Sequence, residues 1–334
     1  MVNADSSRVL QAAQALARGD LIGLPTETVY GLAADAHNPQ AVAKVFQSKG
    51  RPAQHPLIVH LLEAAQVPLF ASHVPRFAQA LMSACWPGPL TLILPKQSGV
   101  ADAAPGGHAT IALRCPSHPM AQALLRAALG LGVQGVAAPS ANLFGSVSPT
   151  TAAHVREAFP QLLVLDGGAC AVGIESTIVD CSRDQPVVLR PGILTASYLS
   201  EVSGMSVLTS ADRAHNASLD RAEPFFSGLV AAAPGTLASH YAPLARLRLL
   251  TAADMAMRLP IVDCRVALWH RSAIPAFTGV LQAVMPSDAV ACAQALFAQL
   301  RELDAQGVQE IWVETPPAGE AWDGVRDRLQ RAAA

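Results

Sequence analysis

The sequence has few aromatic residues and few charged ones. Of its 334 residues, 5% are aromatic and 14% are charged, and the formal net charge is −2. A protein that binds nucleic acid through its overall charge is normally basic, so this composition argues against that class. Binding of nucleic acid through a local basic patch stays open, but the net charge does not indicate it.

Long apolar runs and paired cysteines are also missing. No run of about 18 apolar residues is free of charged, proline or polar interruptions, so the sequence predicts no membrane-spanning helix. The first residues contain no uninterrupted apolar segment of the kind that signal peptides have. The six cysteines are scattered without any C-x-x-C pair: Cys85, Cys115, Cys170, Cys181, Cys264 and Cys292. In a chain of this length they are expected to be reduced, buried thiols, which predicts a cytoplasmic protein.

Several short catalytic motifs are absent. The sequence has no G-x-x-x-x-G-K-[ST], so a nucleotide site would not be a P-loop, and no G-x-S-x-G surrounds Ser140 or Ser176, which argues against a serine hydrolase. Residues 130–135 match G-x-G-x-x-G, but a helix-like run precedes them and a strand-like run follows. We interpret them as a helix end, because a dinucleotide fingerprint must follow a strand and open a helix. His55 and His60 lack the spacing and the cysteine partners of a zinc site, so no protein-held metal is predicted.

The length of the chain suggests two domains. Short strands alternate with helices, which predicts an α/β protein. We expect an open twisted mixed sheet with helices in residues 1–205, a linker in 206–245, and a smaller Rossmann-like α/β domain in 246–334. Strands of the first domain are expected at 21–24, 57–60, 90–94, 110–114, 136–138, 162–166, 176–180 and 187–189.

The stretch between residues 24 and 60 carries the densest set of candidate ligand groups. Thr26 and Thr28 supply neutral hydrogen-bonding groups, and Lys49 and Arg51 flank a glycine. Two cations one residue apart beside a glycine would suit a polyphosphate. A polar loop with a solvated charge pair has the same spacing, so spacing alone leaves both interpretations open.

Two further arginines end apolar strands. Arg114 shares a strand face with Thr110, because side chains alternate along a strand, and Arg190 follows the apolar residues 187–189. Singly, an arginine in such a place is usually a solvated charge at the sheet rim. Together with Lys49 and Arg51, the two could balance the charge of a triphosphate.

Six segments spread over residues 20–245 carry a resemblance to a known family. They are L-P-T-E-T-V-Y-G-L (24–32) with K-G-R-P and H-P-L-I-V-H (49–60), C-W-P-G-P-L-T-L (85–92), A-P-S-A-N with S-V-S-P-T (138–150), G-I-E-S-T-I-V-D (173–180), L-R-P-G (189–192), and P-G with H-Y-A-P (234–243). In these segments the chain resembles the Sua5/YrdC/YciO family, and the last segment resembles the linker of its long, Sua5-type members. The resemblance implies a YrdC-like first domain and a Sua5-type C-terminal domain.

The resemblance also implies an activity, that of an L-threonylcarbamoyladenylate synthase, a nucleotidyltransferase. L-threonine would capture bicarbonate or CO₂ on its amine, and the resulting carbamate would attack the α-phosphorus of ATP. The products would be threonylcarbamoyl-AMP, which passes to the machinery of the t6A tRNA modification, and pyrophosphate. ATP and bicarbonate are thus substrates, and Mg²⁺ is expected as the partner of ATP, without an all-protein cage.

The resemblance assigns roles residue by residue. The positions implied for L-threonine are Thr28, His60, Arg114, Ala138 and Ser176. The positions implied for ATP are Arg51, His55, Thr110, Ser140, Ser148, Arg190 and Tyr241. The catalytic candidates are Lys49 and Arg51. His55 departs from the asparagine of many members, and its charge would vary with pH.

Two other functions remain as alternatives: an RNA-binding module of the YrdC type, and another carbamoyl-adenylating enzyme on the same fold. An RNA-binding module predicts a basic, aromatic-rich surface, which the composition does not favour. The linker likewise has two interpretations. It is either a tether or a lid that carries Tyr241 to the nucleotide and seals the labile carbamate from water.

Overall fold

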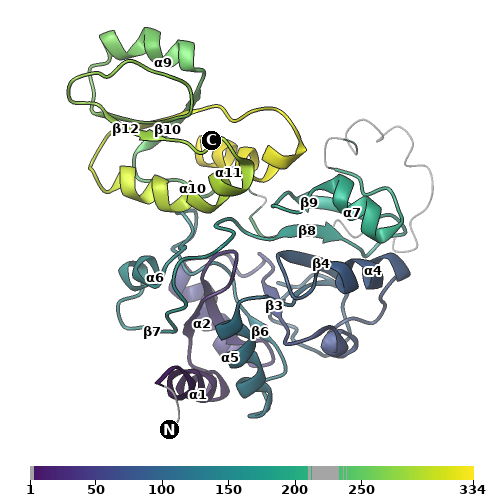
Figure 1. The fold of residues 1–334 in the computed structure, drawn as a ribbon. Coiled ribbons are helices and arrows are strands. Elements are labelled where there is room, and N and C mark those ends of the chain that lie inside the picture. The colour runs from purple at the N-terminus through teal and green to yellow at the C-terminus, as the bar shows by residue number, and fades with distance from the viewer. Residues whose placement is uncertain (1–3, 210–211, 213–232, 236, 238) are drawn as a thin grey trace.

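The chain forms two regions, each built on its own sheet (Figure 1). The computed structural model describes residues 4–209, 212, 233–235, 237 and 239–334. The predicted linker falls largely on 210–211 and 213–232, which lie outside the described residues.

The N-terminal region contains a nine-stranded mixed sheet, which confirms the predicted architecture. Its strands are β1 (Ile22–Leu24), β2 (Gly31–Asp35), β3 (Ile58–His60), β4 (Leu90–Pro95), β5 (Thr110–Arg114), β6 (Val136–Ala137), β7 (Leu163–Val164), β8 (Thr177–Asp180) and β9 (Val187–Arg190). They lie in the order β7-β1-β2-β6-β3-β5-β4-β8-β9. β3 pairs with β5 in parallel and β4 pairs with β5 antiparallel, so the sheet is mixed at its centre.

Helices cover both faces of this sheet. They are α1 (Ala4–Ala17), α2 (Pro39–Lys49), η1 (Ala64–Gln66), α3 (Val67–Phe70), α4 (Arg76–Cys85), α5 (Pro119–Leu129), α6 (Ala152–Ala158) and α7 (Ala196–Ser203). α1 and α5 pack with Ile22, Leu24 and Ala33, whereas Leu32 and Ala34 join the core formed with α2, α4 and α6. The alternation along β2 follows the two-residue period of a strand.

The first two predicted cations, Lys49 and Arg51, lie at the end of helix α2. Asn38 caps the helix, because its side chain accepts a hydrogen bond from the backbone N–H of Ala41 at 3.0 Å. Gly50 ends it in the left-handed conformation with φ 62°, which glycine adopts without a steric cost. Lys49 is therefore the last helical residue and Arg51 the first beyond the turn, so the two cations leave the backbone in different surroundings.

The C-terminal region is a parallel α/β unit. Its elements are β10 (Arg246–Leu250), α9 (Ala252–Arg258), η2 (Leu259–Ile261), β11 (Val266–His270), β12 (Leu281–Val284), α10 (Ala289–Asp304), β13 (Glu310–Glu314), η3 (Glu320–Trp322) and α11 (Asp323–Ala332). The four strands lie in the order β10-β13-β11-β12, all parallel. α10 and α11 lie between this sheet and the N-terminal region, and α9 lies on the other side (Figure 1). The predicted Rossmann-like alternation is confirmed.

Glycines allow α10 and α11 to approach the N-terminal region closely. A Cβ on Gly173 would lie 2.4 Å from the Cα of Gln294 in α10. A Cβ on Gly324 in α11 would lie 2.7 Å from the carbonyl oxygen of Gly192. No side chain fits at such distances, so the two regions meet backbone to backbone at these points.

Two elements of the N-terminal region carry only a weak signal in the sequence: β2, which is absent from the predicted strands, and α7. β2 is buried along nearly its whole length and lacks an alternating pattern, because both of its faces are covered. α7 buries only Leu199, so its apolar periodicity is weak; its start is fixed by Thr195, which accepts a hydrogen bond from the N–H of Tyr198 at 3.2 Å.

Other expectations concern thiols, glycines and membrane helices. All six cysteines are free, and all but Cys264 are buried. α5 ends at Leu129 and β6 begins at Val136, which confirms that residues 130–135 are a helix end and not a dinucleotide loop. Among the described residues, no helix has both the length and the apolar character needed to cross a bilayer.

Candidate active site

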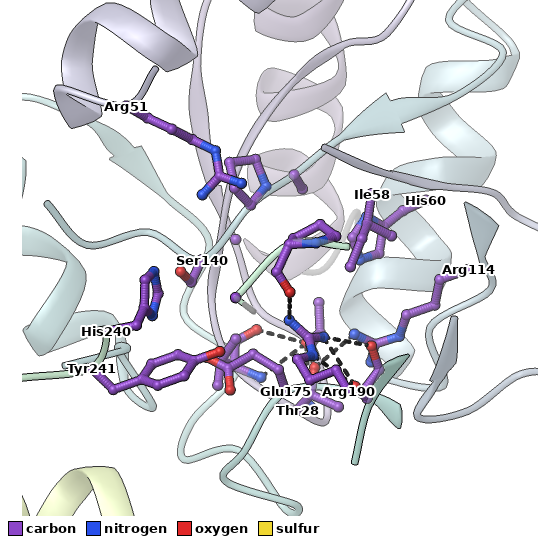
Figure 2. A pocket seen from close by; sticks show the side chains of 18 residues that line it. Thr28, Arg51, Ile58, His60, Arg114, Ser140, Glu175, Arg190, His240 and Tyr241 are labelled. Atoms are coloured by element: carbon purple, nitrogen blue, oxygen red, sulfur yellow. Dashed lines mark hydrogen bonds between the residues drawn. The ribbon is translucent and has the colours of Figure 1, made fainter. Parts of the chain in front are cut away.

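A polar pocket lies where the central strands of the N-terminal sheet meet Pro234, Gly235, His240 and Tyr241 (Figure 2). Its lining comes from segments far apart in the sequence: the turn before β2, the end of α2, β3, β5, the loop after β6, the segment before β8, and β9. The cavity has a volume of about 50 Å³, which is room for a few water molecules and not for a nucleotide.

Neighbouring strands place three polar side chains side by side. His60 and Arg114 are register partners at the ends of β3 and β5, and Arg114 also pairs with Thr91 of β4. Ile111 and Leu113 point into the core shared with α2 and α4. Because side chains alternate along a strand, Arg114 projects from the opposite face, into the pocket.

Arg114 is held by protein groups and still keeps donors for a ligand. Its Nε donates to the carbonyl oxygen of Gly88 at 3.2 Å, and its Nη1 donates to Thr28 Oγ1 at 2.7 Å. Its Nη2 lies 2.7 Å from Glu27 Oε1. A guanidinium has five N–H groups, so these three contacts leave one on each Nη atom. A carboxylate in the pocket could accept both in the bidentate arrangement that arginine favours.

The charge states of Glu27 and His60 follow from their surroundings. Burial is the largest influence on Glu27 and raises its pKa, but the attraction and hydrogen bonding of Arg114 outweigh it and hold the pKa below its usual value. Burial, and then the positive charge of Arg114, lower the pKa of His60 to about 3. At neutral pH Glu27 is therefore charged and His60 is neutral, with one N–H donor and one acceptor nitrogen.

Arg190 closes another side of the pocket. Its Nε and Nη2 donate to the carbonyl oxygen of Ser176 at 3.2 and 3.0 Å, and its Nη1 donates to that of Pro234 at 3.0 Å. The hydroxyl of Ser176 shares a hydrogen bond of 2.7 Å with Thr91 and accepts one from Arg190 Nη2 at 3.2 Å. Its partners thus include no histidine or carboxylate that could activate it as a nucleophile.

Arg51 lines the pocket near Ser140 (Figure 2). Its Nη2 donates to the carbonyl oxygen of Pro56 at 3.1 Å, and its guanidinium carbon lies 5.8 Å from the ring centroid of Phe144. Burial lowers the pKa of Arg51 to about 10, which leaves it charged at neutral pH.

Lys49 lies behind the pocket wall. Its ammonium donates to the carbonyl oxygen of Ser140 at 2.6 Å and to that of Asn142. Burial, and then the charge of Arg51, lower the pKa of Lys49 well below its usual value. The ammonium thereby ties the end of α2 to the loop that presents Ser140.

His240 and Tyr241 form the wall beside the C-terminal region. Their ring centroids are 4.1 Å apart, and the ring of Tyr241 packs against Phe297 of α10 at 5.4 Å. A Cβ on Gly235 would lie 2.3 Å from the hydroxyl oxygen of Tyr241, so the backbone at Gly235 is pressed against it. Burial raises the pKa of Tyr241 to about 12 and lowers that of His240 to about 4, so both are neutral at pH 7.

Buried polar atoms without partners concentrate in this pocket. Buried polar groups in proteins are normally paired, so an unpaired one calls for an explanation. Among the described residues, the unpaired atoms of lining residues are Arg51 Nε, His60 Nδ1, His240 Nδ1 and Tyr241 Oη. Donors and acceptors that face one cavity without partners are typical of a site for a polar ligand.

The structure brings most of the sequence-predicted site residues to the pocket and leaves four outside its lining. Those that line it are Thr28, Arg51, His60, Arg114, Ala138, Ser140, Ser176, Arg190 and Tyr241. Those that do not are Lys49, His55, Thr110 and Ser148. Thr110 and Ser148 are buried, and the ring of His55 lies 5.5 Å from Phe144.

Sequence reasoning missed two buried carboxylates and a histidine of the site. Glu175 lines the pocket, Glu27 pairs with Arg114, and His240 stands next to Tyr241. All three lie inside the quoted motifs. A buried carboxylate one residue from a predicted ligand group was the available signal, since a buried charge requires a partner.

A resident metal does not fit this pocket. Within the described part of the chain, no three His, Cys, Asp or Glu side chains come together as a metal site. Both carboxylates near the pocket are already paired with arginines.

Two family models match the chain. The Sua5/YciO/YrdC model, described as "Telomere recombination", matches residues 14–192. A model described as "Threonylcarbamoyl-AMP synthase, C-terminal domain" matches residues 195–334. The fold and the site define an α/β protein with a small polar pocket lined by buried residues. The two matches show that the chain belongs to the Sua5/YciO/YrdC family.

Individual relatives agree with the family models. The chain is 40% identical to the threonylcarbamoyl-AMP synthase of Pyrococcus abyssi over 71% of its own length and 66% of the relative's. It is 42% identical to the enzyme of that name from Bacillus subtilis over 61% of its own length and 58% of the relative's, so neither alignment spans two thirds of the relative. Sua5 of P. abyssi in a crystal structure complexed with L-threonine superposes with a TM-score of 0.85 at 32% identity, covering 98% of this chain and 94% of that one.

Proposed function

We propose that the protein is a threonylcarbamoyl-AMP synthase of the nucleotidyltransferase class. It would convert L-threonine, bicarbonate and ATP into threonylcarbamoyl-AMP, pyrophosphate and water. The observation that carries the proposal is the single cavity that holds residues of both implied substrate sets together with unpaired buried donors. The names of the relatives and the threonine complex of P. abyssi Sua5 support it.

L-threonine would bind at the ends of β3 and β5. Its carboxylate would accept the two N–H groups of Arg114 that the protein leaves unused. His60 and Ser176, with Thr28, supply neutral donors and acceptors for the amine and hydroxyl of the amino acid. Glu27 balances Arg114 in the free protein, so the guanidinium is already oriented before the substrate arrives.

ATP would bind between Arg51 and Arg190. Both are arginines, which carry a positive charge in proteins, and they line the pocket with Ser140 and Tyr241. Lys49 supports this side through the carbonyl oxygens that its ammonium holds, and its contacts favour an indirect role in shaping the loop of Ser140. The positions of His55, Thr110 and Ser148 outside the lining favour supporting roles for them as well.

The chemistry suits a site without a protein nucleophile. The threonine amine attacks bicarbonate carbon and water leaves, which gives a carbamate. A carbamate oxygen then forms a bond to the α-phosphorus of ATP, and the bond to pyrophosphate breaks. Such a transfer depends on positioning and charge neutralisation, which Arg114, Arg51 and Arg190 can supply. The buried pocket would also protect the carbamate from water.

The small cavity implies that part of the wall moves when ATP binds. Pro234 accepts a hydrogen bond from Arg190, and Gly235 lies against Tyr241, so these two residues occupy space between the proposed phosphate ligands. Displacement of Pro234 would free Arg190 Nη1 for a phosphate oxygen. Magnesium would enter as the ATP complex, since the described residues offer no cage of their own.

We further propose the domain organisation and cellular context. The boundaries would be a catalytic domain in 1–205, a linker in 206–245 and a C-terminal domain in 246–334. The product would pass to the t6A tRNA modification in the cytoplasm.

The test is product formation from labelled bicarbonate. The full chain should convert ¹⁴C-bicarbonate into a nucleotide with the mass of threonylcarbamoyl-AMP only when ATP and L-threonine are both present. Formation of a labelled nucleotide with other amino acids in place of threonine would indicate another carbamoyl-adenylating enzyme. No labelled nucleotide, together with binding of RNA, would favour the RNA-binding alternative and overturn the proposal.

A further inference from the structure

A buried carboxylate stands beside the cations proposed to bind ATP. Glu175 is 6% exposed and lines the same pocket as Arg190. A free carboxylate there would repel phosphate oxygens and attract Arg190, because charges interact strongly away from water. The structure directs its oxygens elsewhere: Oε1 accepts a hydrogen bond from Ser148 Oγ at 2.5 Å, and Oε2 accepts one from Arg328 Nε at 2.8 Å.

Arg328 comes from the C-terminal region. It lies on α11, is fully buried, and donates through Nη2 to the carbonyl oxygen of Glu175 at 3.2 Å. Its Nη1 donates to the carbonyl oxygen of Pro191 at 2.7 Å and to Asp327 at 2.8 Å. The guanidinium carbon lies 5.4 Å from the ring centroid of Tyr241, another pocket residue. One C-terminal side chain thus contacts two residues that line the pocket.

The interface fixes Arg328 in this place. Gly324, one turn earlier on α11, touches the backbone at Gly192, and Gly173, two residues before Glu175, touches α10. Arg301 of α10 adds a second link, because its Nη2 donates to the carbonyl oxygen of Val147 at 2.6 Å. The backbone on both sides of the carboxylate is therefore clamped by the C-terminal region.

Arg190 and Arg328 bind different partners. No ion pair joins Arg190 to Glu175 among the described residues; the donors of Arg190 go to Ser176 and Pro234 instead. If Arg328 were absent, Arg190 would be the remaining arginine whose charge acts on the carboxylate. A buried carboxylate without a partner is costly, so it would compete with phosphate for Arg190.

We infer that Arg328 is a positioning residue of the active site: by pairing with Glu175, it leaves Arg190 available for the phosphates of ATP. The inference rests on the proposed function, because it takes ATP as the anionic ligand. It gives the C-terminal region a role in nucleotide binding without direct contact between that region and the substrate.

Removal of the guanidinium tests the inference. In Arg328→Met the KM for ATP should rise about tenfold or more, with a much smaller change in the KM for L-threonine. The matched control is Arg326→Met on the same helix, since Arg326 bonds to Asp323 and to Pro317 within the C-terminal region. Equal effects of the two substitutions on the KM for ATP would overturn the inference.

A double variant separates electrostatics from packing. Glu175→Gln combined with Arg328→Met removes the competing carboxylate, so the KM for ATP should return to within about threefold of wild type. A double variant no better than Arg328→Met would mean that Arg328 acts only by packing. Where Arg328→Met proves too unstable to assay, Arg328→Lys keeps the charge but loses the fork of N–H groups, so its KM for ATP should rise by less than about tenfold. A tenfold rise in folded Arg328→Lys would contradict the inference.

The dependence on pH gives a readout that a purely structural role would not change. The groups that face Glu175 are Arg328 and Asp327 of α11, Arg190 of β9, Lys49 of α2, and Ser148, His240 and Tyr241. Burial is the largest influence on Glu175 and raises its pKa, but Arg328, Arg190 and Ser148 together hold it below the usual value. Without Arg328 the pKa rises, so Glu175 takes up a proton as the pH falls and ceases to compete.

The KM for ATP of Arg328→Met, divided by that of wild type, should therefore fall as the pH is lowered from neutrality. A ratio that stays constant would contradict the inference. Titration calorimetry with ATP alone distinguishes failure of the inference about Arg328 from failure of the proposed function. If wild type binds ATP but makes no threonylcarbamoyl-AMP, the function is wrong, while weaker ATP binding in Arg328→Met would still support the role of Arg328.

Discussion

The two regions treat their buried polar groups in opposite ways. In the N-terminal pocket, atoms of Arg51, His60 and Tyr241 are buried without a partner. In the described part of the C-terminal region, Trp269 Nε1 is the one such atom. Rossmann-like sheets usually bind ligands beyond the carboxyl ends of their strands. At that end of the C-terminal sheet, Glu314 accepts hydrogen bonds from the protein itself.

The hydrogen bonds that Glu314 accepts stabilise the charged form of its carboxylate. It accepts from the backbone N–H groups of Arg271 and Ser272, both at 2.8 Å, and from the hydroxyl of Ser272 at 2.7 Å. At the opposite ends of the strands, Arg248 pairs with Glu310 at 2.8 Å. The comparison shows that a fold which commonly binds ligands does not by itself provide a binding site. The N-terminal region presents unpaired groups to a cavity, whereas the C-terminal region uses its charged groups in contacts within itself and with the N-terminal region.

The largest expected effect follows removal of Arg114. Arg114→Ala takes away the proposed anchor of the threonine carboxylate, which should cost about 2–5 kcal/mol in threonine binding. It also leaves Glu27 buried without its cation, which lowers the stability of the fold. The measurement is kcat/KM for L-threonine and for L-threoninamide, which lacks the carboxylate. Wild type should prefer L-threonine strongly and Arg114→Ala should not. If the variant keeps the full preference, Arg114 is not the anchor.

Removal of Arg51 or Lys49, the cations on the proposed ATP side, should have the second-largest effect. Arg51→Ala and Lys49→Ala should weaken use of ATP more than binding of threonine, by about 2–3 kcal/mol for loss of a charged hydrogen-bond partner. Arg51 lines the pocket, whereas Lys49 holds the carbonyl oxygens of Ser140 and Asn142, so Lys49→Ala should act by loosening that loop. Calorimetric titration with ATP measures both. Unchanged nucleotide affinity and turnover in both variants would refute the assignment.

A smaller effect should appear in the pH dependence of stability. His60 has a pKa of about 3 when folded and 6.5 as its ordinary value. Between these values the unfolded chain binds a proton that the folded chain does not, so this contribution to stability is lost as the pH falls. Wild type should lose about 2 kcal/mol more than His60→Gln between pH 7 and pH 5.

Urea unfolding of the two proteins at both pH values gives the difference. His240, whose pKa is also lowered, is present in both and cancels. Equal losses in the two proteins would show that His60 is not held neutral.

The smallest effect should come from the C-terminal region. Glu314→Gln weakens the hydrogen bonds at the end of the parallel sheet and should lower the free energy of unfolding by about 1–3 kcal/mol. The KM values for ATP and threonine should not change, because Glu314 lies outside the pocket lining. A large change in either KM, with unchanged stability, would break the contrast between the two regions.

The sequence predicted much of the site because its groups sit inside local patterns. Thr110 and Arg114 fall on one face of β5 through simple alternation, and the sheet register confirms it. Arg51 and Ser140 lie within motifs that the resemblance covers. Elements strongly marked by apolar runs, such as β5, were predicted with their observed bounds.

What the sequence could not predict depends on contacts between distant segments. Glu175 and Arg328 are 153 positions apart, and nothing in the pattern around either residue indicates the other. Lys49 has the same local motif whether its ammonium faces the cavity or the carbonyl oxygens behind it. β2 was missed because a strand buried on both faces loses the alternation that identifies strands.

Exchange of labelled pyrophosphate into ATP tests the central claim most directly, because it requires threonine, bicarbonate and ATP to react in one pocket. We predict rapid exchange with wild type only when L-threonine and bicarbonate are both present, and its loss in Arg114→Ala. Exchange that proceeds without threonine, or that Arg114→Ala leaves unchanged, would contradict the account.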